Sequence, residues 1–183
     1  MVTESDNSYD ELFHEVQRFS LVLRLVVLAT MVTAIGLGYI AIIGAALPPP
    51  HIIGAVVVTI VPIAITVLLI MAKLETIVRS DGFYVRLFPL HLRFRKFTAE
   101  QIQSHYARKY RPILEYGGWG IRYTFSDKGK AYNARGNLGV QLELSTGSRL
   151  LIGSQKPEEL NQALDTIAVR HPLAEIRTSG KGT

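Results

Sequence analysis

The sequence predicts an α+β membrane protein: a transmembrane helical hairpin followed by a small antiparallel β-sandwich or open barrel, capped by a C-terminal helix. Three observations predict this class. No Asp, Glu, Lys or Arg occurs in residues 25–72. After Lys73, short runs of alternating apolar and polar residues replace the continuous apolar pattern, as is typical of strands. Near the end of the chain, Pro157 opens a segment with apolar residues at helical spacing.

The charge-free stretch is long enough to cross a membrane twice. A hydrocarbon core of about 30 Å takes roughly 20 helical residues. Residues 25–47 and 52–72 each supply such a run, and residues 48–51 form the turn between them. A cleaved signal sequence fits less well, because the segment before the first run is acidic and the run exceeds an h-region of about 15 residues.

Small residues recur within the hairpin and indicate close helix packing. Short side chains let helix backbones approach one another in lipid. The hairpin packing on itself and a seam between two copies both explain the pattern. These residues are Ala34, Gly38, Ala41, Ala45, Gly54 and Ala55.

The lysines and arginines near the helix ends predict the orientation. Arg18 and Arg24 flank the first helix, Lys73 and Arg79 follow the second, and the turn between the helices has no lysine or arginine. Positive charge is enriched on the cytoplasmic side of membrane proteins. We therefore expect a cell-membrane protein with two helices and both termini in the cytoplasm.

The composition divides the chain into four regions: an acidic N-terminal segment (residues 1–20), the hairpin (21–74), the β-domain (75–170) and a tail (171–183). In the first region, Leu12, Phe13, Val16 and Phe19 recur at helical spacing. This spacing predicts an amphipathic approach to the membrane, either as a helix in the interface or as an extension of the first membrane helix.

The β-domain is expected to contain seven short strands in two groups. Short turns link the strands within each group, so we expect them all to be antiparallel. A capping box formed by Thr98 and Gln101 predicts a short helix to about Ala107, followed by a loop over residues 111–120 and a later turn at 127–129. The expected strands cover residues 76–80, 83–90, 92–97, 121–125, 131–135, 139–144 and 149–152.

The closing helix should complete the core. Pro157 and the two acids after it suit a first helical turn. Leu160, Leu164 and Ile167 form its apolar stripe.

This order of elements resembles the pleckstrin-homology-like (PH-like) fold. The resemblance lies in the strand pair at residues 74–88, the loop at 116–122 and the ending at 147–160, where a Gly-Ser corner precedes the Pro-started helix. With the hairpin, the chain is similar to small prokaryotic membrane proteins that carry a bacterial PH-like domain. The resemblance covers most of residues 76–169 and implies a binding or scaffolding module.

Basic residues gather in the first three expected strands and form the main candidate surface. Alternation with Phe83, Val85, Leu87, Leu92 and Phe94 predicts that the arginines share a solvent-facing side opposite the core. Such a face could attract an anionic leaflet, bind a partner, or simply be solvated. The candidate residues are Arg79, Arg86, Arg93, Arg95 and Lys96.

Trp119 is the only tryptophan and stands among three glycines. Three roles are open for it: a buried anchor of the β-core, an exposed hot spot for a partner, or an interfacial anchor resting on the bilayer.

No pattern in the sequence predicts catalysis. The chain has no cysteine, which excludes disulfides, thiolate metal sites and a cysteine nucleophile. Its five histidines lack zinc-ligand spacing, and there is no P-loop or nucleophile elbow. We expect no enzyme activity, no cofactor and no metal. Nucleic-acid binding is not expected either, despite a pI near 9.6, because the domain is tethered to a membrane and lacks the aromatic-plus-basic pattern of an RNA-reading sheet.

The expected function is that of a non-enzymatic adaptor or assembly protein, which presents a cytoplasmic PH-like domain at the membrane surface. Its expected partners are membrane lipids and another membrane protein or a second copy of the chain. The alternative is an accessory subunit of a membrane transport or enzyme complex, bound through its transmembrane hairpin.

Overall fold

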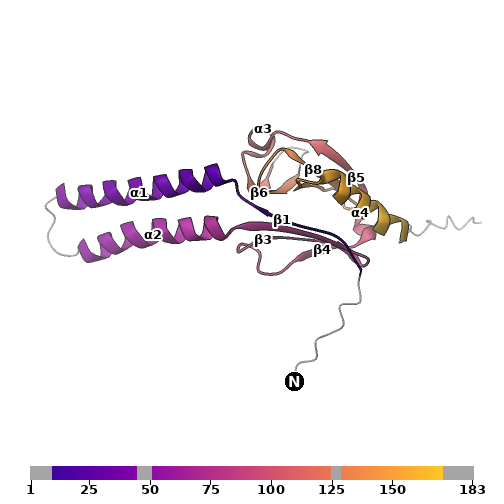
Figure 1. The fold of residues 1–183 in the computed structure, drawn as a ribbon, viewed down its shortest axis with the longest axis horizontal. Helices are drawn as coiled ribbons and strands as arrows, with labels where there is room; N and C mark the ends of the chain where they lie inside the picture. The colour runs from indigo at the N-terminus through magenta and orange to yellow at the C-terminus, as the bar shows by residue number, and fades with distance from the viewer. Residues whose placement is uncertain (1–9, 45–50, 125–128, 171–183) are drawn as a thin grey trace, which may run out of the picture.

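The computed structural model describes residues 10–44, 51–124 and 129–170. They form a helical hairpin, two β-sheets and a closing helix (Figure 1). The elements in chain order are β1 (Glu11–Arg18), α1 (Leu21–Gly44), α2 (His51–Met71), β2 (Lys73–Arg79), β3 (Gly82–Phe88), β4 (Arg95–Phe97), the 3-10 turn η1 (Ala99–Gln101), β5 (Ile102–Lys109), α3 (Pro112–Tyr116), β6 (Gly120–Tyr123), β7 (Lys130–Asn133), β8 (Leu138–Leu144), β9 (Arg149–Gly153) and α4 (Pro157–Arg170).

Helices α1 and α2 are both long and apolar enough to span a membrane, with mean hydropathies of 2.3 and 2.8 over their most apolar windows. They pack against one another at Gly38, where a Cβ atom would overlap the Val58 side chain. The Tyr39 hydroxyl lies 3.1 Å from Thr59 Oγ1 and links the two helices. Gly38 therefore packs the hairpin on itself, whereas Gly54 has no neighbour within 4 Å.

The segment before the hairpin is a strand, so the amphipathic helix expected from the spacing of Leu12, Phe13, Val16 and Phe19 is wrong, both as an interfacial helix and as an extension of α1. β1 pairs antiparallel with β2 along its whole length, from Glu11 opposite Arg79 to Arg18 opposite Lys73. Phe13 and Gln17 point into the molecule and are buried. The first sheet thus contains strands from both sides of the hairpin.

Sheet A has the order β1-β2-β3-β4 and sheet B the order β5-β8-β9-β7-β6. Nine strands, rather than seven, occur in the residues that the structure describes. The expectation that all strands are antiparallel is also wrong, because β7 pairs parallel with β9. Strand β9 lies between β7 and β8, although β7 and β8 are neighbours in sequence.

The region between β3 and β5 differs from the expected strand and helix. Only residues 95–97 form a strand there, and Leu92, expected in the core, is 74% exposed. The Thr98 N–H donates to Gln101 Oε1 at 3.1 Å, as in a capping box, but the chain makes only the η1 turn before β5 begins at Ile102. The expected loop over residues 111–120 contains the short helix α3.

Helix α4 begins at Pro157 as expected and closes the core. It contacts β5 and β8 of sheet B and β1 and β2 of sheet A. Leu160, Leu164 and Ile167 are almost fully buried in one cluster with inward residues of both sheets. The expected turn at residues 127–129 falls largely outside the described residues, as does the C-terminal tail.

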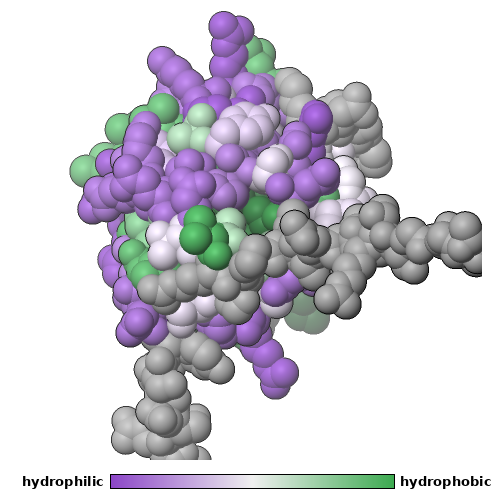
Figure 2. All heavy atoms as spheres, turned by 90° about the vertical axis from the view of Figure 1, so that its right-hand side faces the viewer, coloured by the Kyte–Doolittle hydropathy of each residue, from purple (hydrophilic) through white to green (hydrophobic). Residues whose placement is uncertain are grey.

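Two polar side chains of β1 hold the corner that precedes α4. Gln17 Nε2 donates to the Gly153 carbonyl at 2.7 Å. The Glu15 carboxylate accepts from Ser154 Oγ at 2.6 Å and from the Gln155 N–H at 2.8 Å. The N-terminal strand therefore binds the end of sheet B directly. The surface of the molecule opposite the hairpin is mostly hydrophilic (Figure 2).

Candidate functional site

The hairpin and sheet A form one continuous unit. Strand β1 ends at Arg18 and α1 begins at Leu21, while α2 ends at Met71 and β2 begins at Lys73. Arg18 and Lys73 face each other across the two strands. The paired strands thus lead directly into the paired helices (Figure 1). We call the part of the β-domain around Arg18 and Lys73 the hairpin-facing end.

Two segments at the hairpin-facing end expose large apolar side chains. Because Phe88 pairs with Lys73, the connection over residues 89–94 lies beside the end of α2. Helix α3 lies at the same end of the domain (Figure 1). Isolated exposed apolar residues are common, but four of them on two segments beside apolar helices point to a contact surface. They are Leu90 and Leu92 on the first segment and Ile113 and Leu114 on α3, each 58–76% exposed.

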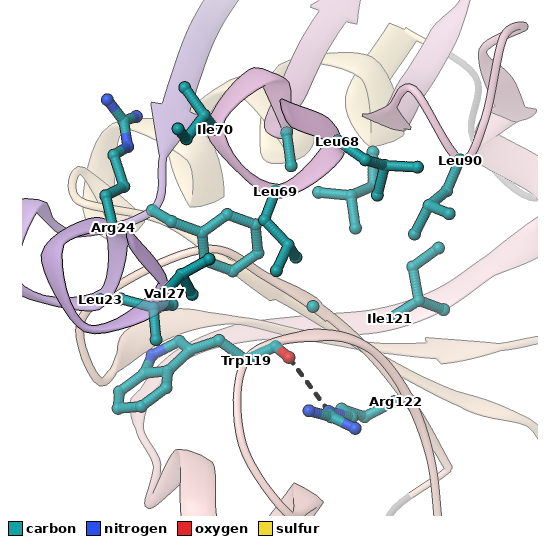
Figure 3. Close-up of a pocket in the computed structure, with 14 residues that line it drawn as sticks. Leu23, Arg24, Val27, Leu68, Leu69, Ile70, Leu90, Trp119, Ile121 and Arg122 are labelled. Carbon is teal, nitrogen blue, oxygen red and sulfur yellow. Dashed lines mark hydrogen bonds between the residues drawn. The ribbon is translucent and has the colours of Figure 1, made fainter. Parts of the chain in front are cut away.

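At this end a cavity of about 360 Å³ lies between the hairpin and the β-domain. Leu23, Arg24 and Val27 of α1 line one side, and residues 68–70 of α2 line another. The loop and strand residues Trp119 to Arg122 close it from the β-domain (Figure 3). The lining is apolar except for the two arginines, and it includes no acidic residue.

Polar contacts fix the β-domain wall of this cavity. Trp119 Nε1 donates to the Gly136 carbonyl at 3.1 Å, and the Trp119 carbonyl accepts from Arg122 Nε at 3.0 Å. Arg24 lies across the cavity from Arg122, and its buried Nε has no hydrogen-bond partner (Figure 3). Gly117, Gly118 and Gly120 have positive φ angles, which glycine adopts readily, so the loop can turn Trp119 towards α1.

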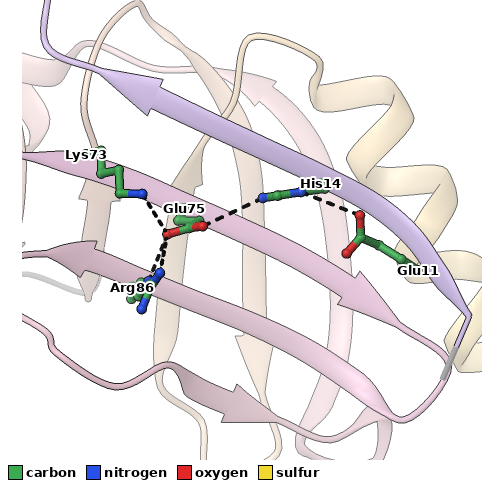
Figure 4. Close-up of polar contacts among 5 residues, drawn as sticks. All are labelled: Glu11, His14, Lys73, Glu75 and Arg86. Carbon is green, nitrogen blue, oxygen red and sulfur yellow. Dashed lines mark hydrogen bonds and ion pairs between the residues drawn. The ribbon is translucent and has the colours of Figure 1, made fainter. Parts of the chain in front are cut away.

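The outer face of sheet A, on the side away from the core, carries an ion-pair network around Glu75. Its carboxylate lies 2.7 Å from Arg86 Nη2, 3.5 Å from Lys73 Nζ and 3.8 Å from His14 Nε2 (Figure 4). Burial acts to raise the pKa of Glu75, but the hydrogen bond and charge of Arg86, followed by Lys73, outweigh it and lower that pKa. Glu75 is therefore ionised in the folded protein at neutral pH.

A second polar group lies further along the same face. Asp81 accepts from Lys96 Nζ at 2.6 Å and from the Tyr84 hydroxyl at 2.5 Å. Burial opposes ionisation of Asp81, yet these two hydrogen bonds leave its pKa lowered. Arg86 also lies over the Phe94 ring, 4.1 Å from its centroid. Both networks combine cations with aromatic rings on one exposed face.

The candidate basic residues do not form one surface, so the expected common side is wrong. Arg86 and Lys96 lie on the outer face with Tyr84. Arg95 pairs with the buried Val85 and therefore projects to the opposite side of the sheet. Arg93 lies in the connection at the hairpin-facing end.

The candidate basic residues also differ in their distance from the membrane helices along the sheet. Arg79 ends β2, about 20 Å from the end of α2 at 3.3 Å per residue. Sequence proximity to the hairpin therefore does not place Arg79 near the helices.

Trp119 is the candidate whose position is most informative, because it lines the cavity next to α1 and is half-buried. The contribution of Arg122 to the cavity, and the exposure of Leu114 on α3, were not predicted. The sequence signal for them was weak: residue 24 and residue 122 are distant in the chain, and only the fold brings them to one cavity.

The part of the chain that the structure describes contains no group of three or more potential metal ligands. A comparison with curated proteins gave no match. Residues 9–170 match the model of a family described as a family of unknown function, DUF6141. The match spans β1, the hairpin, both sheets and α4. On this match, the chain belongs to the DUF6141 family.

Proposed function

We propose that this protein is a non-enzymatic, membrane-anchored adaptor or assembly protein. Its hairpin would cross the cell membrane twice, with both termini and the β-domain in the cytoplasm. The observation that carries this proposal is the continuity of β1 with α1 and of β2 with α2, with at most two residues between each strand and helix. A domain held by two such short joints has a fixed orientation on the membrane, which suits presentation to a partner.

The outer face of sheet A is the surface that this arrangement would present. Strands β1 and β2 continue away from the helices (Figure 1), so this face would stand away from the bilayer rather than lie on it. Arg79 at its far end lies well beyond the screening length of about 8 Å. Arginine and aromatic side chains, such as Arg86, Phe94 and Tyr84, are enriched in protein interfaces. The geometry therefore favours a protein partner for this face.

We further propose that the β-domain is PH-like. Two sheets closed by the C-terminal helix α4 support this assignment, together with the Gly153-Ser154 corner. The parallel pairing of β7 with β9 and the strand contributed from before the hairpin depart from the simplest antiparallel scheme.

Membrane placement can be tested with introduced cysteines, since the chain has none. Cysteine in place of Pro49 should react with an impermeant thiol reagent added to intact cells. Cysteine in place of the exposed Ser104 should react only after lysis. Labelling of residue 104 in intact cells would overturn the cytoplasmic placement.

The adaptor role can be tested by cross-linking and mass spectrometry in the native host. A partner of the outer face should be recovered with the full chain. It should also be recovered with a soluble version in which Asn-Gly replaces residues 19–72. Loss of that partner from the soluble version, with recovery by a hairpin fused to an unrelated domain, would contradict the adaptor role.

The alternative function is an accessory subunit bound through the hairpin. The exposed flanks of α1 and α2 favour it, since Gly36 and Gly54 have no neighbour within 4 Å and leave room for another helix. In that case the hairpin fusion, rather than the soluble version, should recover the partner.

A further inference from the structure

We propose that the cavity between the hairpin and the β-domain binds one anionic phospholipid from the cytoplasmic leaflet. Its acyl chain would lie against Leu23, Val27 and Leu69, and its phosphate would pair with Arg122. This inference rests on the proposed membrane placement and adds a specific ligand to it.

The size and chemistry of the cavity fit such a ligand. At about 360 Å³ it lies at the lower end of ligand pockets, roughly 300–1,000 Å³, which suits part of a lipid rather than a whole one. Its walls are apolar, and arginines are its only charged side chains. No carboxylate in the described residues pairs with Arg122, whose Nε donates to the Trp119 carbonyl. Arginine recognises phosphate well because its planar group donates several hydrogen bonds.

The position of the cavity selects the membrane as the source of the ligand. It is bounded by the first turns of α1 and the last turns of α2, the level at which headgroups meet acyl chains when the helices span a bilayer. Trp119, a residue type enriched at that level, forms part of its wall. The exposed Leu90 and Leu114 flank the same end. An amphiphile with an apolar chain and an anionic head matches this gradient from apolar to basic.

Because Trp119 is the only tryptophan, its fluorescence reports directly on the cavity. We would reconstitute the full chain in phosphatidylcholine vesicles. One set of vesicles would contain a small fraction of phosphatidylglycerol with brominated acyl chains, and a second set the same fraction of brominated phosphatidylcholine. Bromine quenches tryptophan fluorescence at short range. One arginine near an anionic lipid is worth about fivefold in local enrichment, or about 1 kcal/mol. Brominated phosphatidylglycerol should therefore quench Trp119 more strongly than brominated phosphatidylcholine does.

Matched variants assign the effect to Arg122. Arg122→Gln should reduce quenching by the anionic lipid to the level of the zwitterionic lipid, and Arg122→Lys should restore most of it. Arg149→Gln removes the same charge from the start of β9, outside the cavity, and should leave the preference unchanged. An unchanged Trp119 emission maximum would show that the loop is intact in each variant.

The remaining outcomes separate the two proposals. Equal quenching by both lipids in the wild type, or a preference that persists in Arg122→Gln, would overturn the lipid site while leaving the membrane placement standing. Absence of the protein from the vesicles, with no quenching by either lipid, would overturn the membrane placement itself.

Discussion

At the scale of single residues, Glu75 is a nearly buried carboxylate that connects neighbouring strands of sheet A. It is only 8% exposed, yet it is ionised because Arg86, followed by Lys73, lowers its pKa. It ties β2 to β3 through Arg86 and approaches β1 through His14. An ion pair at this depth is costly to break, since the remaining partner keeps its charge in a poorly hydrated site.

Replacing Glu75 by Gln should destabilise the protein at pH 7 by about 1–2 kcal/mol, because Arg86 loses a charged partner. The folded pKa of Glu75 lies below its usual range, so its contribution is present at neutral pH and is lost as the pH falls through that lowered pKa. The difference between wild type and Glu75→Gln in thermal unfolding should therefore shrink in acid.

The same change at Glu159 provides the control for this prediction. Glu159 pairs with Lys156 at 2.9 Å, but both side chains are more than half exposed. An exposed pair is worth at most about 1 kcal/mol. If Glu159→Gln were as costly as Glu75→Gln, the network around Glu75 would have no special role in stability.

At the scale of secondary-structure elements, local patterns predicted some segments and misled on others. The two apolar helices and α4 follow from length and periodicity alone. Strand β1 could not be predicted in this way, because its inward positions 15 and 17 are Glu and Gln. Both side chains form hydrogen bonds to residues 153–155, contacts that no local pattern encodes. The apolar residues that remained happened to fall at helical spacing.

The sequence also did not predict which distant elements pair with one another. Short connections suggested antiparallel neighbours throughout, but β9 pairs between β7 and β8. The cavity beside Trp119 likewise draws its walls from three separate stretches of chain. Individual site residues such as Trp119 were recognisable by type, whereas their juxtaposition depended on the fold.

The α1–α2 contact can be tested at Gly38. Gly38→Leu should push the helices apart, because even a Cβ at this position would overlap Val58. We expect a lower thermal unfolding temperature in detergent. Gly36→Leu makes the same change two residues earlier, where nothing lies within 4 Å, and should be tolerated. If Gly36→Leu were the more damaging variant, that side of α1 would contact another chain.

Helix α4 can be tested at Leu164, which is 1% exposed in the main core cluster. Leu164→Ala should destabilise the protein by about 2–5 kcal/mol, the usual cost of truncating a buried leucine. Val169→Ala, on the same helix at a 79% exposed position, should cost far less. Equal melting curves for Leu164→Ala and wild type would show that α4 is peripheral to the fold.

At the scale of the whole molecule, the hairpin is an insertion between two strands that face each other. Arg18 and Lys73 are direct partners in sheet A, so a two-residue turn such as Asn-Gly fits between them. A chain with Asn-Gly in place of residues 19–72 should fold as a monomeric β-domain with a cooperative thermal transition.

A shorter chain that starts at residue 73 provides the contrast. It lacks β1 and therefore loses the buried Phe13 and Gln17, as well as the hydrogen bonds to the 153–155 corner. It should melt at a lower temperature than the Asn-Gly version or aggregate. Equal stability of the two chains, measured by circular dichroism, would mean that β1 is dispensable.

The pairing of β1 with β2 also bears on biosynthesis. The ribosome makes β1 first, and its partner emerges only after all of α1 and α2 has been synthesised. If the hairpin inserts into a membrane, a chain with only one helix across the bilayer would leave β1 and β2 on opposite sides. Sheet A could not close, and the core residues Leu74 and Val78, which pair with β1, would stay accessible to proteases and chaperones. In that case closure of sheet A would require both helices to be inserted, a requirement that a domain placed wholly after the hairpin would not have.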